Sequence, residues 1–306
     1  MKQKRFVIIL ISTLFTLLLA WPISASAASN KCYVLSPSKN YSYNLDGKGK
    51  KETISYTITT QKQNYEDYNT VTVKVNNGVI YKKTAKYDDF AVIVTDVNTQ
   101  DKQMELLIVQ TDMSRIWWNG KMSGGFWGQG IKSIRYYTYS SGKVKFRQDL
   151  ATVFKSKFAK KDVYTLHFYD EKTAFKVTGK GTIEMILCLQ VGSEKNSYGG
   201  SQFDYQHIVR TLKLKNGKFT AVTKKEYTLQ KYMPELYLSQ NTKVLAKAGG
   251  KKVAYTIKKG GYMKVIGIYR TSKGKLYLKV SNKNKKTGYI DSNGKIYGDL
   301  IGTNHM

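Results

Sequence analysis

The sequence predicts an all-β protein, and three features indicate this class. Apolar and polar residues alternate with a period of two over long stretches, such as residues 54–59 and 71–75. Short turn signals, Asn77-Gly78, Ser141-Gly142 and Asn216-Gly217, separate stretches of this kind. The composition holds 24 Tyr but only 3 Pro, which suits half-exposed strands better than helices.

The elements follow in order along the chain. Asn77-Gly78 is expected to turn strand 71–75 into strand 79–81, and residues 90–94 and 106–109 predict nearly continuous buried strands. One helix is predicted from Asp149 to Lys160, with Asp149 as its cap and Val153, Phe154 and Phe158 on one side. Further strands are expected at 183–189, 209–214, 219–222, 244–247, 253–257, 262–269, 276–280 and 287–290.

The first 27 residues have the pattern of a secretory signal peptide. Lys2, Lys4 and Arg5 precede an apolar run over residues 6–21, and Ala25-Ser26-Ala27 supplies a small-residue cleavage site. As a helix the run would rise about 24 Å, less than the about 30 Å of a hydrocarbon core. An uncleaved anchor is the alternative. No later segment approaches about 20 apolar residues, so we expect a secreted or cell-wall-associated protein that does not span the membrane once mature.

The charge is strongly positive and unevenly distributed. The formal net charge is +30, and residues 231–306 hold 16 Lys and Arg against three acidic residues. Such a field concentrates anionic partners. Nucleic acid would be the first expectation, but predicted export favours peptidoglycan or anionic wall polymers instead. The alternative is that lysine only keeps the protein soluble.

The length after residue 27 is sufficient for two domains, expected at 28–230 and 231–306. Pro234, the change in strand spacing and the change in charge together indicate this boundary. Only two cysteines are present, Cys32 and Cys188, and Cys188 lies in a predicted buried strand. We expect two unpaired thiols, with one disulfide as the alternative.

The last 65 or so residues resemble the bacterial SH3-like (SH3b) domain. The resemblance rests on residues 253–260, 263–269 and 275–280, and on Thr287-Gly288-Tyr289-Ile290, where Tyr289 stands in place of the Trp common in that motif. It implies a small five-stranded barrel that binds cell-wall peptide or glycan, or that acts as a spacer. The candidate ligand-binding residues at the last hairpin are Lys279, Lys283, Lys285 and Lys286, with a solvated loop as the alternative.

Three loops in the first 230 residues resemble the D-x-D-G-x-G-x-x-E loops of FG-GAP and VCBS-type repeats. They lie at 44–52, 96–105 and 177–182, and the third is degenerate. The resemblance implies a β-propeller-like or irregular β-repeat domain. The intact family loop encloses a hard cation such as calcium, but Lys48 occupies an expected ligand position and Lys50 and Lys51 add positive charge. We therefore predict no metal and no cofactor.

Three tryptophans lie within eleven residues among glycines: Trp117, Trp118 and Trp127. Exposed Trp rings are good platforms for sugar faces, so these residues are candidate ligand-binding groups. The alternative is that this loop folds back and its rings fill a core.

No catalytic residue is predicted, because the motifs of common hydrolases are missing. The sequence holds no H-E-x-x-H, no G-x-S-x-G and only three histidines. The sequence therefore predicts a non-enzymatic exported cell-envelope protein. The main alternative is a secreted glycan-active enzyme that uses carboxylates, with Asp88-Asp89 and Glu66-Asp67 as the candidate pairs. A structural component without glycan affinity is a third possibility.

Overall fold

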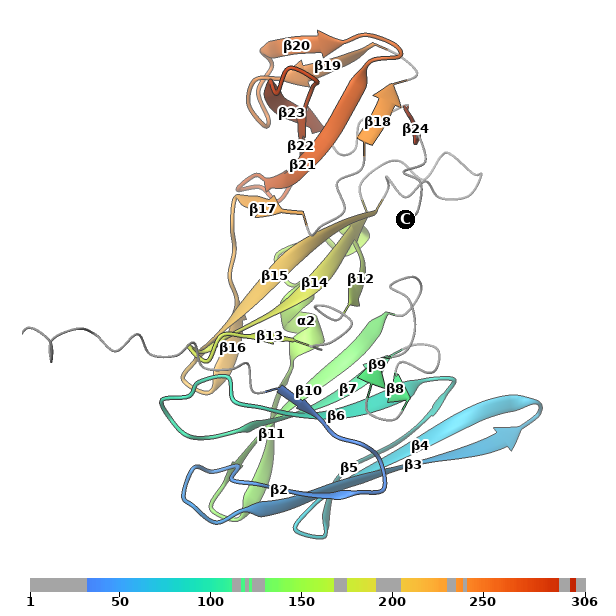
Figure 1. Cartoon of the computed structure of the whole chain (residues 1–306), viewed down its shortest axis with the longest axis vertical. Coiled ribbons are helices and arrows are strands. Elements are labelled where there is room, and N and C mark those ends of the chain that lie inside the picture. The colour runs from blue at the N-terminus through green and yellow to red at the C-terminus, as the bar shows by residue number, and fades with distance from the viewer. Residues whose placement is uncertain are drawn as a thin grey trace, which may run out of the picture.

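The computed structural model describes residues 32–111, 117–118, 121–122, 130–167, 175–190, 205–229, 235–238, 241–291 and 298–300. Over these residues the chain forms several antiparallel sheets with very little helix, which confirms the predicted all-β class (Figure 1). The predicted signal peptide, residues 1–27, lies outside the described residues.

Three four-stranded meanders follow one another along the chain. The first sheet runs β2 (Asn40–Tyr43), β3 (Glu52–Gln63), β4 (Glu66–Val75) and β5 (Gly78–Lys86). The second runs β6 (Asp89–Thr95), β7 (Glu105–Thr111), β10 (Ile131–Ser140) and β11 (Lys143–Asp149), with β1 (Cys32–Val34) beside β6. The third runs β13 (Lys176–Val177), β14 (Thr182–Gln190), β15 (Tyr205–Lys215) and β16 (Lys218–Ala221), and β12 (Val163–His167) also pairs with β14.

The fourth sheet contains eight strands from the last part of the chain. Its members are β17 (Glu226–Thr228), β18 (Glu235–Leu238), β19 (Thr242–Leu245), β20 (Val253–Ile257), β21 (Tyr262–Arg270), β22 (Leu276–Ser281), β23 (Thr287–Asp291) and β24 (Gly298–Leu300). The five strands predicted from the sequence are β19 to β23, and β17, β18 and β24 add to them among the described residues. Because β17 precedes residue 231 and pairs with β21, this sheet takes a strand from before the expected boundary.

The second sheet lies between the first and third sheets, and its strands β6 and β7 are buried on both faces. Phe90, Val92 and Val94 of β6 pack against the first sheet, in one core cluster with Ile54 and Val73. The alternate residues Ala91 and Ile93 belong to a second cluster that continues through the third and fourth sheets. This two-sided burial explains the nearly continuous apolar runs at 90–94 and 106–109.

The hairpin turns agree with the sequence in two cases and differ by one residue in the third. Ser141-Gly142 and Asn216-Gly217 both have positive φ, as a type I′ turn requires. At the first turn the two central residues are Asn76 and Asn77, with φ of 48° and 66°, and Gly78 begins β5. The assignment to Asn77-Gly78 was therefore wrong, because asparagine also tolerates the left-handed region.

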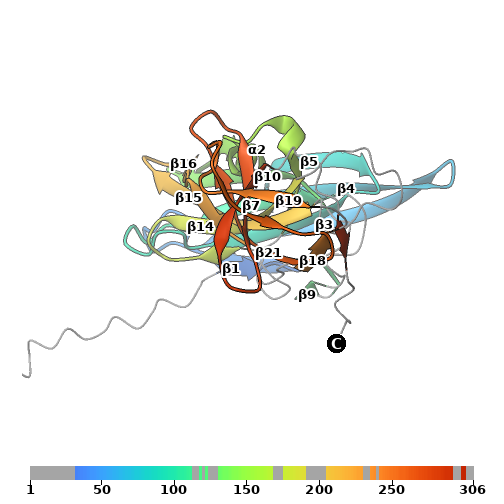
Figure 2. The same cartoon turned by 90° about the horizontal axis from the view of Figure 1, so that it is seen from above.

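The β3–β4 hairpin ends in a turn that the sequence did not indicate. Asn64 and Tyr65 both have positive φ, and the Tyr65 side chain is fully exposed. The hairpin extends beyond the other sheets in both views (Figure 1, Figure 2).

The helix is shorter than predicted. It spans α2 (Leu150–Lys155), and the side chain of Asp149 caps it by accepting from the Ala151 N–H at 2.9 Å, as expected. A short 3₁₀ turn, η1 (Lys160–Asp162), follows. Arg210 of β15 is fully buried and donates to the carbonyls of Phe154 and Ser156 at the end of α2. These bonds satisfy carbonyl groups that the end of the helix leaves without an intrahelical partner.

Both cysteines are free thiols, Cys188 in the buried strand β14 and Cys32 half-buried in β1. Burial raises the pKa of the Cys32 thiol to about 11 and that of Cys188 to about 12. Both thiols are therefore protonated near neutral pH. Among the described residues, no helix has the length and apolar character needed to cross a membrane.

Candidate functional site

The three loops that resemble one another in sequence lie side by side in space. Gly47 of the first loop has φ of +73°, and a Cβ there would lie 3.1 Å from the carbonyl oxygens of Asp101 and Lys102 in the second. In the third, the Gly181 N–H donates to the Val97 carbonyl at 2.8 Å, and the Gly179 carbonyl accepts from Thr99. Residues about 50 and 130 positions apart therefore form one loop cluster.

The first two loops close in the same way, through a buried glutamate at the start of the following strand. Glu52 accepts from the Leu45 N–H and Glu105 accepts from the Val97 N–H, each at 2.9 Å. Both side chains are 3% exposed. Burial raises the pKa of the Glu105 carboxyl to about 8, although the bond from Val97 opposes this rise. These two carboxyl groups hold the loops together.

Other loop carboxylates bind backbone groups in the same loop. Asp46 accepts from the Lys48 N–H at 2.9 Å, and Asp101 accepts from the Gln103 N–H at 3.0 Å, the geometry of an Asx-turn. Over the part of the chain that the structure describes, no group of three or more His, Cys, Asp or Glu is placed to hold a metal ion.

A pocket of about 310 Å³ opens beside the loop cluster. Tyr33, Tyr43 and Met104 supply apolar walls, and Asn44, Asp96, Thr99 and Lys102 supply polar groups. The rings of Tyr33 and Tyr43 lie 5.5 Å apart between centroids. Burial, with Tyr33 and Tyr41 nearby, raises the pKa of Tyr43. This pocket was not predicted from the sequence, although the repeated loops were a signal for where its polar groups would gather.

The predicted lysines separate into two groups. Lys283, Lys285 and Lys286 are exposed and lie in one tight turn between β22 and β23. We call residues 282–286 the lysine turn. Asn282 fixes the lysine turn through two hydrogen bonds of 3.0 Å. Its side-chain oxygen accepts from the Lys286 N–H, and its main-chain carbonyl accepts from the Lys285 N–H. The Tyr255 hydroxyl of β20 donates to the Lys286 carbonyl at 2.9 Å, so the turn is anchored to the neighbouring hairpin.

Lys279 lies apart from the lysine turn, on strand β22. Its ammonium forms an ion pair with Glu226 of β17, and this contact raises the pKa of Lys279. Lys279 therefore joins β17 to the fourth sheet, and its charge is balanced in the structure.

The structure describes two of the three predicted tryptophans, as part of a short strand. Trp117 and Trp118 form strand β8 (Trp117–Trp118), which pairs with β9 (Lys121–Met122) in a two-stranded hairpin. Trp127 lies outside the described residues. Whether these rings bind a ligand stays a prediction.

No family model, curated protein or solved structure matches this chain. A functional interpretation therefore depends on its own residues.

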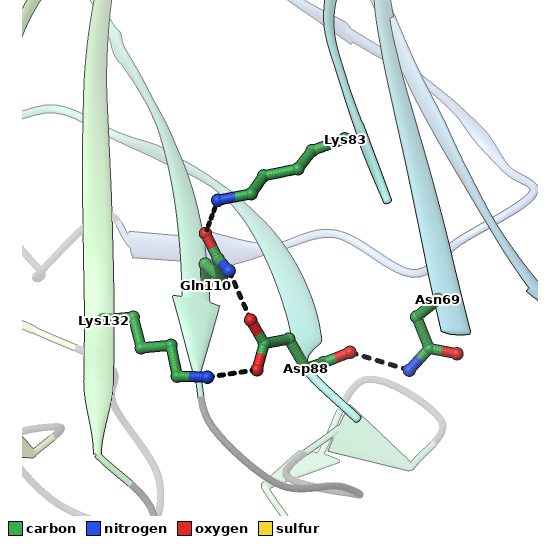
Figure 3. A network of polar contacts seen from close by, with 5 residues as sticks. All are labelled: Asn69, Lys83, Asp88, Gln110 and Lys132. Carbon is green, nitrogen blue, oxygen red and sulfur yellow. Dashed lines mark hydrogen bonds and ion pairs between the residues drawn. The ribbon is translucent and has the colours of Figure 1, made fainter. Parts of the chain in front are cut away.

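Asp88, a carboxylate considered for catalysis, is buried in a polar network between the first two sheets (Figure 3). One carboxylate oxygen accepts from Lys132 and the other from Gln110, whose own side-chain oxygen accepts from Lys83 at 2.7 Å. The Asn69 amide donates to the Asp88 carbonyl at 2.7 Å. The two carboxylate oxygens of Asp88 are thus bonded to β10 and β7, and its main-chain carbonyl is bonded to β4.

Two of the other three candidate carboxylates, Asp89 and Glu66, also have local partners. Asp89 accepts from the Phe90 N–H at 2.8 Å, and Glu66 forms an ion pair with Lys86. Asp67 lies next to Glu66 on β4, where its carbonyl accepts from the Tyr87 N–H at 2.9 Å. These contacts lie at the ends of strands and at the edges of hairpins.

Proposed function

We propose that this is a non-enzymatic exported cell-envelope protein whose C-terminal sheet binds anionic cell-wall polymers, while its larger β domain presents an interaction surface. The observation that carries the proposal is the charge of residues 241–291. This segment holds 13 lysines and one arginine, against a single acidic residue, Asp291. A surface of this kind concentrates polyanions and makes their binding depend on salt.

The arrangement of this charge supports a polymer ligand. Lys275 is paired with Asp291 and Lys279 with Glu226, whereas the lysine turn holds three exposed lysines on a backbone fixed by Asn282. The fixed backbone of the turn holds these three lysines close together, which concentrates positive charge at one place on the surface. The lysine turn is therefore the part of the sheet that we assign to wall polymers.

The architecture supports the predicted families at the level of strand order. The meanders β2–β5, β6–β11 and β13–β16 each place four antiparallel strands in chain order, as blades of a propeller-like repeat do. The fourth sheet supports an SH3-like module through β19 to β23. Export, and with it access to wall polymers, follows from the predicted signal peptide.

The test is sedimentation of the purified chain from residue 28 onward with isolated cell wall, with and without its anionic polymers. The triple change Lys283→Gln, Lys285→Gln and Lys286→Gln should weaken binding about 100-fold at low salt, from about 1 kcal/mol for each lysine near an anionic surface. It should also lower the slope of log affinity against log salt by about one per lysine.

The matched control changes three exposed lysines of the β15–β16 hairpin: Lys213→Gln, Lys215→Gln and Lys218→Gln. It removes the same charge and should change binding far less. Equal losses in the two triple variants would mean that net charge alone acts. Unchanged binding in the first variant would reject the lysine turn as the contact.

A further inference from the structure

We infer that the pocket beside the loop cluster binds a neutral pyranose sugar, with an N-acetylhexosamine as the best fit. The inference does not depend on the lysine turn, which lies in the fourth sheet, whereas this pocket lies between the first strands of the first and second sheets.

The apolar wall of the pocket is built from tyrosines on two different sheets. Tyr33 of β1 and Tyr43 of β2 lie with their ring planes 37° apart, and Tyr41 continues the row at 6.5 Å from Tyr43 with nearly parallel rings. Tyr33 lines the pocket and is 41% exposed, so part of its side chain is accessible to a ligand from solvent. Amphipathic rings of this kind present a flat apolar face that suits the C–H side of a pyranose.

The polar groups match the hydroxyl and amide donors of a sugar. The side-chain oxygen of Asn44 is buried and has no hydrogen-bond partner among the described residues, so it needs a donor. The Asp96 carboxylate lines the same pocket and is 9% exposed. Thr99 and Lys102 complete the rim, and Lys102 supplies a donor for a sugar oxygen.

The charges that line the pocket suit a neutral ligand. Asp96 and Lys102 are one acid and one base, so the lining itself carries no excess of either sign to select an anion or a cation. Within neutral sugars, an acetamido group adds an N–H for the Asn44 oxygen and a methyl group for Met104. At about 310 Å³ the pocket lies at the lower end of the about 300–1,000 Å³ range of ligand pockets, which suits a short saccharide.

The test is calorimetry of the chain from residue 28 onward with tri-N-acetylchitotriose as the probe. We expect saturable binding that Tyr33→Ala weakens about tenfold. Asn44→Ala should also weaken it about tenfold while leaving the melting temperature unchanged or higher, because it removes a buried acceptor without a partner. A purely structural Asn44 would instead give a lower melting temperature.

The matched control is Tyr65→Ala, because Tyr65 is a fully exposed tyrosine at the tip of the β3–β4 hairpin. It should leave the affinity unchanged. No saturable binding up to about 10 mM, or equal affinity in all three variants, overturns the inference. Tighter binding of tetramethylammonium or of glucuronate than of the chitotriose would overturn the assignment to a neutral sugar. The lysine-turn variant should keep full affinity for the chitotriose, so failure here and failure of wall-polymer binding can be told apart.

Discussion

Glu105 should make the protein less stable as the pH rises through neutrality, and Glu105→Gln should remove this effect. The carboxyl is buried at the start of β7, where it accepts from the Val97 N–H. Asp101 and Asp96 lie nearby and add to the rise in its pKa caused by burial. Tyr136 also faces it, and burial together with Glu105 raises the pKa of that phenol. Glutamine keeps an oxygen for the Val97 N–H but cannot ionise.

The sign and size of the effect follow from the two pKa values of Glu105. The usual value is 4.5 and the folded value is about 8, so the folded state binds more protons between them. The free energy of unfolding therefore falls as pH rises from about 4.5 to about 8 and levels off above that. Each pH unit between the two pKa values is worth about 1.4 kcal/mol. Relative to low pH, Glu105 therefore lowers the free energy of unfolding by under about 1 kcal/mol at pH 5, by about 3 kcal/mol at pH 7 and by about 5 kcal/mol at pH 9.

The measurement is urea unfolding of the wild type and of Glu105→Gln at pH 5, 7 and 9. The free energies of unfolding of the two proteins should differ little at pH 5. At pH 9 the variant should be more stable than the wild type by several kcal/mol. Glu52→Gln is the control, because it makes the same substitution at the matching position of the first loop. It should leave the decrease in the free energy of unfolding with pH that Glu105 causes in place. A difference between wild type and Glu105→Gln that stays constant with pH would refute the reasoning.

Two further substitutions test the packing. Arg210→Met removes the donors to the end of α2 and to Tyr227, so we expect a loss of about 3–5 kcal/mol in urea unfolding; a loss below about 1 kcal/mol would contradict the capping role. Gly288→Ala should cost about 1–3 kcal/mol, because a Cβ there would overlap Val244 and lie 2.7 Å from the Leu245 carbonyl oxygen. Gly78→Ala, where the nearest atom is 3.4 Å away, is its control and should be close to neutral.

Local turn chemistry explains why most strands could be predicted and where the prediction slipped. Positive φ at Ser141-Gly142 and Asn216-Gly217 is encoded in the residues themselves. Asn64-Tyr65 adopts the same conformation, but tyrosine carries no turn signal, so this turn depends on the long β3–β4 pairing. The short helix is a similar case, because the carbonyls at its end are bonded by Arg210, 54 residues beyond Ser156.

The candidate site was predictable only in part, for a related reason. The loops at 44–52 and 96–105 stood out in the sequence by their shared pattern. Their partnership with Tyr33 could not be read from any local pattern, because β1 joins the second sheet by pairing with β6, about 60 residues away. The ion pair of Lys279 with Glu226 joins residues 53 positions apart in the same way.

The repeat itself explains why a pocket forms at this place. Each meander turns through a loop between its first two strands, and the sheets stack face to face through the two core clusters. Stacking brings corresponding loops of successive sheets together, so a polar loop that recurs in the sequence becomes a continuous polar cluster. The outer face of the first sheet ends the stack on this side, since Thr57, Thr59, Lys74 and Lys82 are exposed there. No further sheet packs on that outer face, so the gap between the first two loops is not covered there. Tyr33 and Tyr43 line the pocket that remains.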